Sequence, residues 1–356
     1  MNLKRCVTRL LPPVITDALC AAKRRIWPTA REEEIPPTGP DDQIPATAPD
    51  DQITPAPPED QIPPAPPEDQ IPPIPPGDEP ITFELNGCLL RMPRSHSLPW
   101  ILEYSPQYEG EIGRVAAFLL AKQGRLSIID VGANIGDTVA SIPCRERATF
   151  LCIEGSVNYF SLLRQNFTGA PNVICVNAIL SDSADLVAPR ALAEVNGTAH
   201  VVEALTASSA ADPPTRTLDA VLADHPDFPA PNFLKVDTDG YDLKVLCGAD
   251  GLLRANRPAI HFELSFRHWK DFGGSSWRQA AELLTCAGYR DFLLYDTQGY
   301  LAGVDAFQSS ALLSALEGYC FRRPRPLYIW FNVVTFHESD PHWEEFKASE
   351  LGRTLD

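Results

Sequence analysis

Residues 126–138, LSIIDVGANIGDT, combine the residue types that could bind a charged small molecule. Apolar residues lead into Asp130, and Gly132 and Gly136 follow with G-x-x-x-G spacing. This order predicts a buried parallel strand, a glycine-rich turn and a helix N-terminus. Because glycine has no side chain, such a turn can bring backbone close to a ligand. An acid ahead of the turn fits a site that also holds a cation. The spacing matches neither the G-x-G-x-x-G dinucleotide fingerprint nor the phosphate loop, whose lysine is missing.

Further apolar runs downstream also end in acids. We expect strands at residues 148–154, 172–180, 233–242 and 258–266. Glu154 stands at the tip of the second strand, about 20 residues after the glycine loop, where doubly wound folds grip a ribose. Asp237 stands at the tip of the fourth strand, and Glu263 lies in the fifth. Five parallel strands with acids at their carboxyl ends would build one crevice.

Taken in order, these motifs resemble the FkbM-type methyltransferases, a family of class I S-adenosylmethionine-dependent enzymes. The resemblance rests on DVGANIGDT, IE, NAILSD, LKVDTDGYDLKVLCGAD and P-x-I-x-x-E, and it covers residues 81–338. It implies an α/β fold with a doubly wound, mostly parallel, seven-stranded Rossmann-like sheet and an antiparallel end strand. The chain departs from the family where Gly155 and Ser156 replace a Pro-containing turn, and where Asp239 and Asp242 stand in place of Glu.

The resemblance implies S-adenosylmethionine as the cofactor. The Gly132–Gly136 loop and Asp130 would lie under its amino-acid end and sulfonium, with Asn134 bonded to the same end. Glu154 would accept both ribose hydroxyls through charge-assisted hydrogen bonds. The full cofactor set comprises Asp130, Gly132, Ala133, Asn134, Gly136, Asp137, Glu154, Asn177, Ser181 and Asp182, of which the last three would edge the adenine. A tight strand-to-helix turn explains the glycines equally well when they are considered alone.

Methyl transfer from a sulfonium depends mainly on alignment of the reactants. A hydroxyl acceptor also needs a group that takes its proton, and the candidates are Asp237, Glu263 and His268. Asp239 and Asp242 either orient substrate or cap the helix expected near Gly240. No paired histidine spacing supports a metal site, so none is expected.

The function predicted from the sequence is therefore O-methylation of a hydroxyl on a sugar, glycan or small metabolite. A nicotinamide-dependent oxidoreductase and a non-catalytic S-adenosylmethionine-binding module are the alternatives. The absent dinucleotide fingerprint weighs against the first, and the intact set of strand-end acids weighs against the second. Nucleic acid is not expected as a partner, because the remainder of the chain, residues 81–356, has a net charge of −10 and no Arg-rich stripe.

The chain divides into three segments of different composition. Residues 1–31 are basic and amphipathic, with a net charge of +6, and residues 32–80 have a net charge of −13 with no basic residue. The first segment fits either a flexible basic tail or a helix lying on an anionic membrane. The second segment repeats a unit close to P-P-E-D-Q-I-P-P-A every nine residues, which predicts an extended, disordered, polyproline-rich linker. Residues 81–356 are the predicted methyltransferase domain, with its core at residues 108–338.

The nine cysteines are scattered, and none forms a C-x-x-C pair. They are typical of buried residues in a reducing compartment, so we expect a cytoplasmic protein, with membrane contact at the inner face as the alternative. Within the globular part we expect a hairpin with its turn at Asn86–Gly87, a helix over the sheet edge at residues 108–123, a helix at residues 277–287, and two final strands at residues 289–301 and 327–337.

Overall fold

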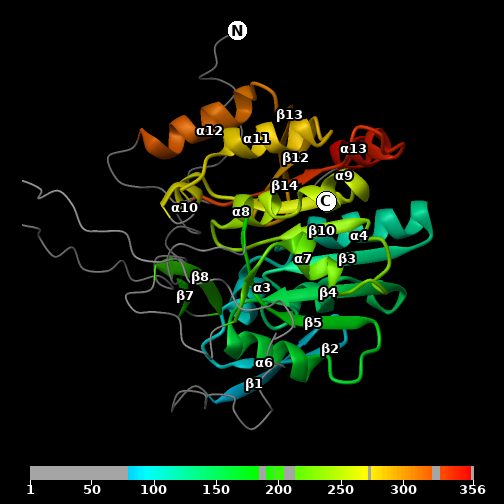
Figure 1. Cartoon of the computed structure of the whole chain (residues 1–356), viewed down its shortest axis with the longest axis vertical. Helices are drawn as coiled ribbons and strands as arrows, with labels where there is room; N and C mark the ends of the chain where they lie inside the picture. Colours follow the sequence, from blue (N-terminus) through cyan, green and yellow to red (C-terminus); the bar gives the residue numbers. More distant parts are fainter. Residues whose placement is uncertain are drawn as a thin grey trace, which may run out of the picture.

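A computed structural model describes residues 79–183, 190–195, 197–203, 213–271, 274–322 and 329–353. The basic segment at residues 1–31 and the repeats up to residue 78 lie outside the described residues. Figure 1 shows the main sheet as a stack of strands that runs from β13 near the top to β5. In spatial order its eight strands are β13 (Leu301–Ala306), β12 (Asp291–Asp296), β14 (Phe331–Thr335), β11 (Ala259–Leu264), β10 (Phe233–Val236), β3 (Leu126–Val131), β4 (Ala148–Glu154) and β5 (Val173–Asn177).

The parallel half of this sheet consists of the five strands expected from the sequence. β11, β10, β3, β4 and β5 pair in parallel register. Every residue of β3, β10 and β11 is buried, as strands covered on both faces require. Because the five strands point the same way, their carboxyl ends meet along one edge of the sheet.

The other end of the sheet differs from the prediction. The strand expected at residues 289–301 ends early as β12, and after a turn β13 pairs with it, so the sheet has eight strands instead of seven. The Asp296 carboxylate accepts hydrogen bonds from the backbone N–H groups of Gln298 and Tyr300, and Gly299 has φ +80°, which together turn the chain. β14 is antiparallel to both of its neighbours and lies between β11 and β12, not at the sheet edge.

Helices pack on both faces of the sheet. Successive residues of β3 point to opposite faces, so Ile128 and Ile129 belong to different hydrophobic cores. One core includes side chains from α4 (Gly110–Gln123), α5 (Asp137–Ser141), α6 (Val157–Asn166) and α13 (Trp343–Leu351). The opposite core includes side chains from α7 (Leu218–Ala223), α8 (Asp242–Cys247), α9 (Asp250–Ala255), α10 (Phe266–Asp271), α11 (Trp277–Cys286) and α12 (Ala311–Phe321).

The helix α4 lies over the middle of the sheet instead of over its edge, where the sequence predicts it. Its residue Glu111 is fully buried and accepts a hydrogen bond from the Asn332 amide on β14 at 2.7 Å. The same oxygen contacts His261 Nε2 on β11 at 2.9 Å. A buried acid on the first turn of α4 therefore fixes that turn above the strands whose ends carry the candidate acids.

Several smaller elements complete the fold. β1 (Pro80–Leu85) and β2 (Cys88–Pro93) form the expected hairpin, with left-handed residues Asn86 and Gly87 at its turn. The helix α3 (Leu98–Tyr104) follows it, and η2 (Arg145–Arg147) is a short 3-10 turn. Between β5 and α7, β7 (Arg190–Val195) and β8 (Thr198–Glu203) form an antiparallel hairpin, and β6 (Ile179–Leu180) pairs with β9 (Thr215–Arg216). Among the described residues, no helix combines the length and hydropathy needed to cross a bilayer.

Gly132 and Gly136 are explained by packing within the protein. Gly132 has φ +76°, and a Cβ there would lie 1.8 Å from the carbonyl oxygen of Asp237. Gly136 has φ +90°, and a Cβ there would lie 2.1 Å from the ring of Phe167. The missing side chains therefore let the end of β3 approach the end of β10 and let the start of α5 approach Phe167.

We predict that Gly132→Ala destabilises the fold far more than Gly169→Ala. Gly169 has φ +79°, and a Cβ there would meet no atom within 4 Å, so its substitution reports the left-handed strain alone, about 1–3 kcal/mol. Gly132→Ala adds a clash with backbone that cannot move without separating β3 from β10. Chemical denaturation should show at least about 2 kcal/mol of additional loss, and equal losses in the two variants would refute this close approach.

Candidate functional site

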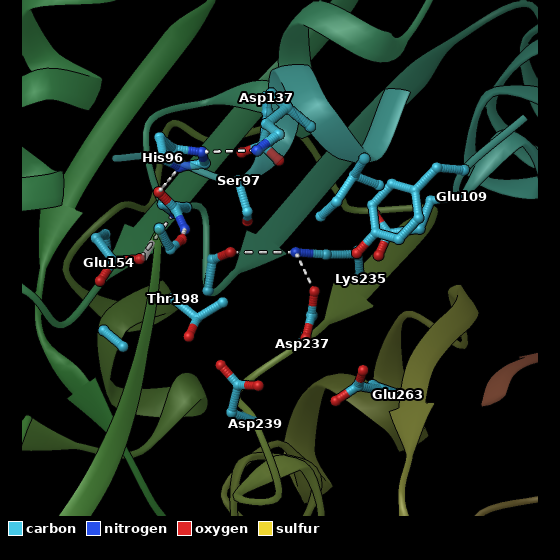
Figure 2. A pocket seen from close by; sticks show the side chains of 17 residues that line it. His96, Ser97, Glu109, Asp137, Glu154, Thr198, Lys235, Asp237, Asp239 and Glu263 are labelled. Atoms are coloured by element: carbon cyan, nitrogen blue, oxygen red, sulfur yellow. Dashed lines mark hydrogen bonds and ion pairs between the residues drawn. The ribbon is translucent and has the colours of Figure 1, made fainter. Parts of the chain in front are cut away.

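A cleft opens at the carboxyl ends of the central strands, between β3, β4, β10 and β11. It encloses about 750 Å³, including its open mouth, which is within the usual range for small-molecule sites. Seven residues expected in the site line it: Gly132, Asn134, Asp137, Glu154, Asp237, Asp239 and Glu263. Figure 2 shows Glu154 on one side of Lys235 and Glu109 on the other, with Asp237, Asp239 and Glu263 below. The parallel strands thus bring together acids that are far apart in the sequence.

Glu154 is held rigidly at the end of β4. One carboxylate oxygen accepts the backbone N–H of Asn134 at 2.8 Å, and the other accepts the N–H of Ser156 at 2.6 Å. Burial raises the pKa of Glu154 to about 7, although these two bonds and Lys235 favour the charged form. Each oxygen keeps a lone pair for a further donor. The carboxylate is therefore suited to two neighbouring hydroxyl groups of a ligand, whose bonds would restore its charge.

Asn134 connects the glycine loop to the hairpin of β7 and β8. It has φ +50°, its amide donates to the carbonyl of Gly197 at 2.6 Å, and its amide oxygen lies 3.3 Å from His96 Nε2. The N–H of Gly197 donates to the Tyr159 hydroxyl at 3.1 Å. Gly197, Thr198 and Ala199 consequently form part of the cleft wall.

The buried ammonium of Lys235 is the feature that sequence reasoning missed. It lies 3.2 Å from Asp130, 3.6 Å from Asp237 and 3.1 Å from the carbonyl oxygen of Gly132, to which it donates. Burial disfavours its charge, but Asp130 and then Asp237 outweigh burial and raise the pKa of Lys235 well above its ordinary value. Its presence inside the apolar strand FLKV was a signal in the sequence, because an unpaired lysine is rarely buried.

Three predicted loop residues lie behind the cleft wall instead of lining it. Asp130 is fully buried, and its carboxylate is engaged by Lys235. Ala133 is fully buried, and Gly136 precedes the first residue of α5. Asp130 can thus act on a ligand only through Lys235, which it orients and keeps charged.

The three residues expected to edge the adenine also lie outside the cleft lining. The Asn177 amide donates to the carbonyl of Glu154 at 2.7 Å, and the Ser181 hydroxyl donates to Asp182. Asp182 is paired with Lys244 at 2.7 Å. Their polar groups are used by the protein itself.

The acids after β10 separate into two kinds. Asp242 is fully buried, and its carboxylate accepts the N–H groups of Thr238 and Gly240 at 3.4 and 3.2 Å. Burial, followed by the charge of Asp237, raises the pKa of Asp242 well above its ordinary value. Asp239 has φ +50° and lines the cleft. Neither acid is the N-cap of α8, which begins at Asp242 after Tyr241, so the structure does not favour the capping alternative.

His268 is placed away from the cleft lining. It lies on α10 with 4% of its surface exposed. Its ring packs edge to face against the ring of Trp330, with the two ring centroids 5.0 Å apart. A Cβ added to Gly240 would lie 2.8 Å from the His268 backbone, so α10 packs against the turn that carries Asp239. The structure therefore gives His268 a packing position beside the site.

Two further acids with raised pKa values line the cleft. Glu109, which precedes α4 with φ +52°, lines the cleft next to Tyr108. Burial and then Asp237 raise the pKa of Glu109 to about 8. Burial likewise raises the pKa of Asp137 to about 6, against the influence of Lys235. Among the described residues that line the cleft, six are carboxylic acids and Lys235 is the only lysine or arginine.

The strand order, with β14 reversed between β11 and β12, is that of the class I methyltransferase fold. Residues 130–290 match the family model described as the methyltransferase FkbM domain. Residues 130–290 therefore resemble an FkbM methyltransferase domain, and the resemblance predicted from the motifs is confirmed over these residues.

The chain resembles solved structures only weakly. The chain is 13% identical to M. jannaschii TYW2 in complex with AdoMet, over 73% of this chain and 88% of that one, with a TM-score of 0.35. It is 16% identical to methyltransferase FkbM from Methylobacillus flagellatus KT, over 47% of this chain and 39% of that one, with a TM-score of 0.30. No curated protein matches the chain. The identification therefore rests on the family match.

The cofactor that this family implies is S-adenosylmethionine, and the cleft fits it. Glu154 is a buried, preoriented acceptor for the two ribose hydroxyls. Lys235 is a cation at the cleft wall, suited to the carboxylate of the amino-acid end. The surrounding acids suit the ammonium and the sulfonium. When bound, the cofactor would supply an activated methyl group.

We predict that the affinity for S-adenosylhomocysteine rises with pH up to about 7. The pKa of Glu154 is raised from 4.5 to about 7, so below pH 7 the free protein holds a proton there that ribose binding must expel. One pKa unit corresponds to about 1.4 kcal/mol, so affinity should weaken at least about tenfold between pH 7.5 and 5.5. Calorimetric titration should show that Glu154→Gln removes most of this slope. If the substitution leaves the pH dependence of the affinity unchanged, groups other than Glu154 cause it.

We also predict that Lys235→Met destabilises the fold by about 3 kcal/mol or more, because it leaves Asp130 buried without a counter-charge. The double variant Asp130→Asn with Lys235→Met removes both charges and should recover at least half of that loss. Urea denaturation of the three proteins measures both effects. A double variant no more stable than Lys235→Met would contradict the pairing.

Proposed function

We propose that the chain is an S-adenosylmethionine-dependent methyltransferase that methylates a hydroxyl group of a sugar, glycan or small metabolite. The observation that carries this proposal is the position of Asp237 and Glu263, which line the same cleft as Glu154. Acids at the ends of β10 and β11 provide proton acceptors for a hydroxyl that enters from the open side. The family match supports the methyl transfer, and the acids support the kind of acceptor.

Binding and alignment are the first tasks of the site residues. Glu154 would bind the ribose, and Lys235 with the loop N–H groups would hold the amino-acid carboxylate. These contacts fix the donor at both ends. Alignment of this kind can contribute effective molarities of about 10⁵ M or more, which is the main requirement when the leaving group is already good.

Proton removal is the second task, and we assign it to Asp237. Asp237 is partly exposed in the cleft, with its carboxylate 3.6 Å from Lys235. Its charge contributes to the raised pKa of Glu109, about 8, which keeps Glu109 largely protonated at neutral pH.

The test of the function is transfer of an isotope-labelled methyl group from S-adenosylmethionine to neutral sugars and small alcohols by the full chain. We expect label in the acceptor and stoichiometric S-adenosylhomocysteine. Calorimetric titration with S-adenosylmethionine and with NAD should show binding of the first alone. Binding of NAD alone would instead identify an oxidoreductase, and cofactor binding without transfer to any acceptor would identify a binding module.

We predict that Asp237→Asn lowers kcat about 10²-fold or more while binding of S-adenosylhomocysteine changes less than threefold, because general-base catalysis contributes about 10²–10⁴-fold. Asp239→Asn is the matched control, since it removes a carboxylate from the same turn. Single-turnover kinetics separate the chemical step from binding. Equal effects of the two substitutions on kcat would remove Asp237 from the proton-accepting role.

A further inference from the structure

We propose that the acceptor is an uncharged glycan, and that Trp100 and Tyr104 form a platform for its sugar rings at the mouth of the cleft. The proposal rests on the proposed function and names the substrate class of the same site. It is carried by an exposed aromatic pair, by the position of that pair on α3, and by the charge of the cleft.

The aromatic pair is the first observation. Trp100 is 39% exposed and Tyr104 is 67% exposed, and their ring centroids lie 4.9 Å apart. Single exposed apolar side chains are common and need no explanation, but two large rings in contact at the surface form a patch. Aromatic faces carry negative charge density, which attracts the polarised C–H groups on the apolar face of a sugar ring.

The position of the pair on α3 is the second observation. Ser97, Leu98 and Ile101 line the cleft, so this face of the helix forms part of its wall. At about 100° per residue, Tyr104 lies about 60° from Ile101 around the helix, and Trp100 lies about 100° from it in the same direction. Both rings therefore lie next to the face of α3 that lines the cleft, on one side of it.

The charge of the cleft is the third observation, and it selects among sugars. Six carboxylic acids line the described walls, and the single lysine is engaged by Asp130 and Asp237. Carboxylates accept strong hydrogen bonds from hydroxyls. They would repel a phosphate, sulfate or uronate group. A cationic acceptor is disfavoured as well, because the methyl donor itself brings a sulfonium into the cleft.

The acids in the cleft and the exposed rings beside it together fit a neutral polyol. Its hydroxyls would meet acids inside the cleft, and its apolar ring faces would meet Trp100 and Tyr104 at the mouth. A single ring inside the cleft would not reach both regions as well as an oligosaccharide would, so we assign the acceptor to a glycan and not to a monosaccharide.

Affinity electrophoresis of the full chain tests the proposal without depending on methyl transfer. Native gels would contain laminarin, galactomannan or soluble starch as neutral probes, polygalacturonate as the anionic probe and chitosan as the cationic probe. We expect retardation by at least one neutral polysaccharide and none by polygalacturonate or chitosan. The double variant Trp100→Ala with Tyr104→Ala should lose at least tenfold in affinity for that polysaccharide.

The control is Leu351→Ala, which removes an exposed apolar side chain on α13 and should bind like the unmodified protein. The proposal is overturned if no neutral polysaccharide retards the protein, if a charged one does so instead, or if the double variant binds equally well. Loss of binding to phosphatidylglycerol vesicles in the double variant, with glycan binding retained, would instead identify a membrane contact. Calorimetric binding of S-adenosylhomocysteine, measured in parallel, shows separately whether the proposed function stands.

Discussion

The buried ammonium of Lys235 is the interaction on which the rest of the site depends. It joins the carboxylate of Asp130 on β3, the carbonyl of Gly132 and the carboxylate of Asp237 beyond β10. A buried carboxylate without such a partner would be strongly destabilising. The glycine at position 132 allows this arrangement, because any side chain there would collide with the Asp237 backbone. One cation thus sets the distance between two strand ends and presents a positive charge at the cleft wall.

Around that cation the cleft holds more carboxylic acids than one ammonium can pair with. Burial raises the pKa of Glu154 to about 7, that of Asp137 to about 6 and that of Glu109 to about 8. Such clustering costs stability in the free protein and is typical of sites that bind or react. A ligand with hydroxyl donors and a positive centre relieves this cost, since it supplies the hydrogen bonds and the charge that the acids lack. The shape of the cleft and its charge therefore favour the same class of ligand.

The sequence was sufficient to predict the features that depend on local patterns of residues. Continuous apolar runs identified the five parallel strands, and the acids at their ends identified Glu154, Asp237 and Glu263 as neighbours in one cleft. Residues brought in by tertiary packing could not be found in this way. Glu109 reaches the cleft because Glu111, on the first turn of α4, is bonded to β11 and β14. Gly197 reaches it because Asn134 and Tyr159 bond to its backbone.

Other differences have equally local causes. Asn177 lies within a predicted strand, and Ser181 and Asp182 follow it, but hydrogen bonds and an ion pair within the protein occupy their side chains. The turn at Asp296 and Gly299 divides an apparently continuous strand because a single carboxylate caps two backbone N–H groups. Lys235 could have been recognised, since a charged residue within a buried strand implies an opposite charge close by.

A crystal structure of the full chain with S-adenosylhomocysteine tests the central claim most directly. We expect the ligand's ribose hydroxyls to lie within hydrogen-bonding distance of both Glu154 oxygens and its carboxylate to face Lys235. A ligand bound elsewhere, or one whose ribose avoids Glu154 while Lys235 contacts only Asp130 and Asp237, would contradict this claim.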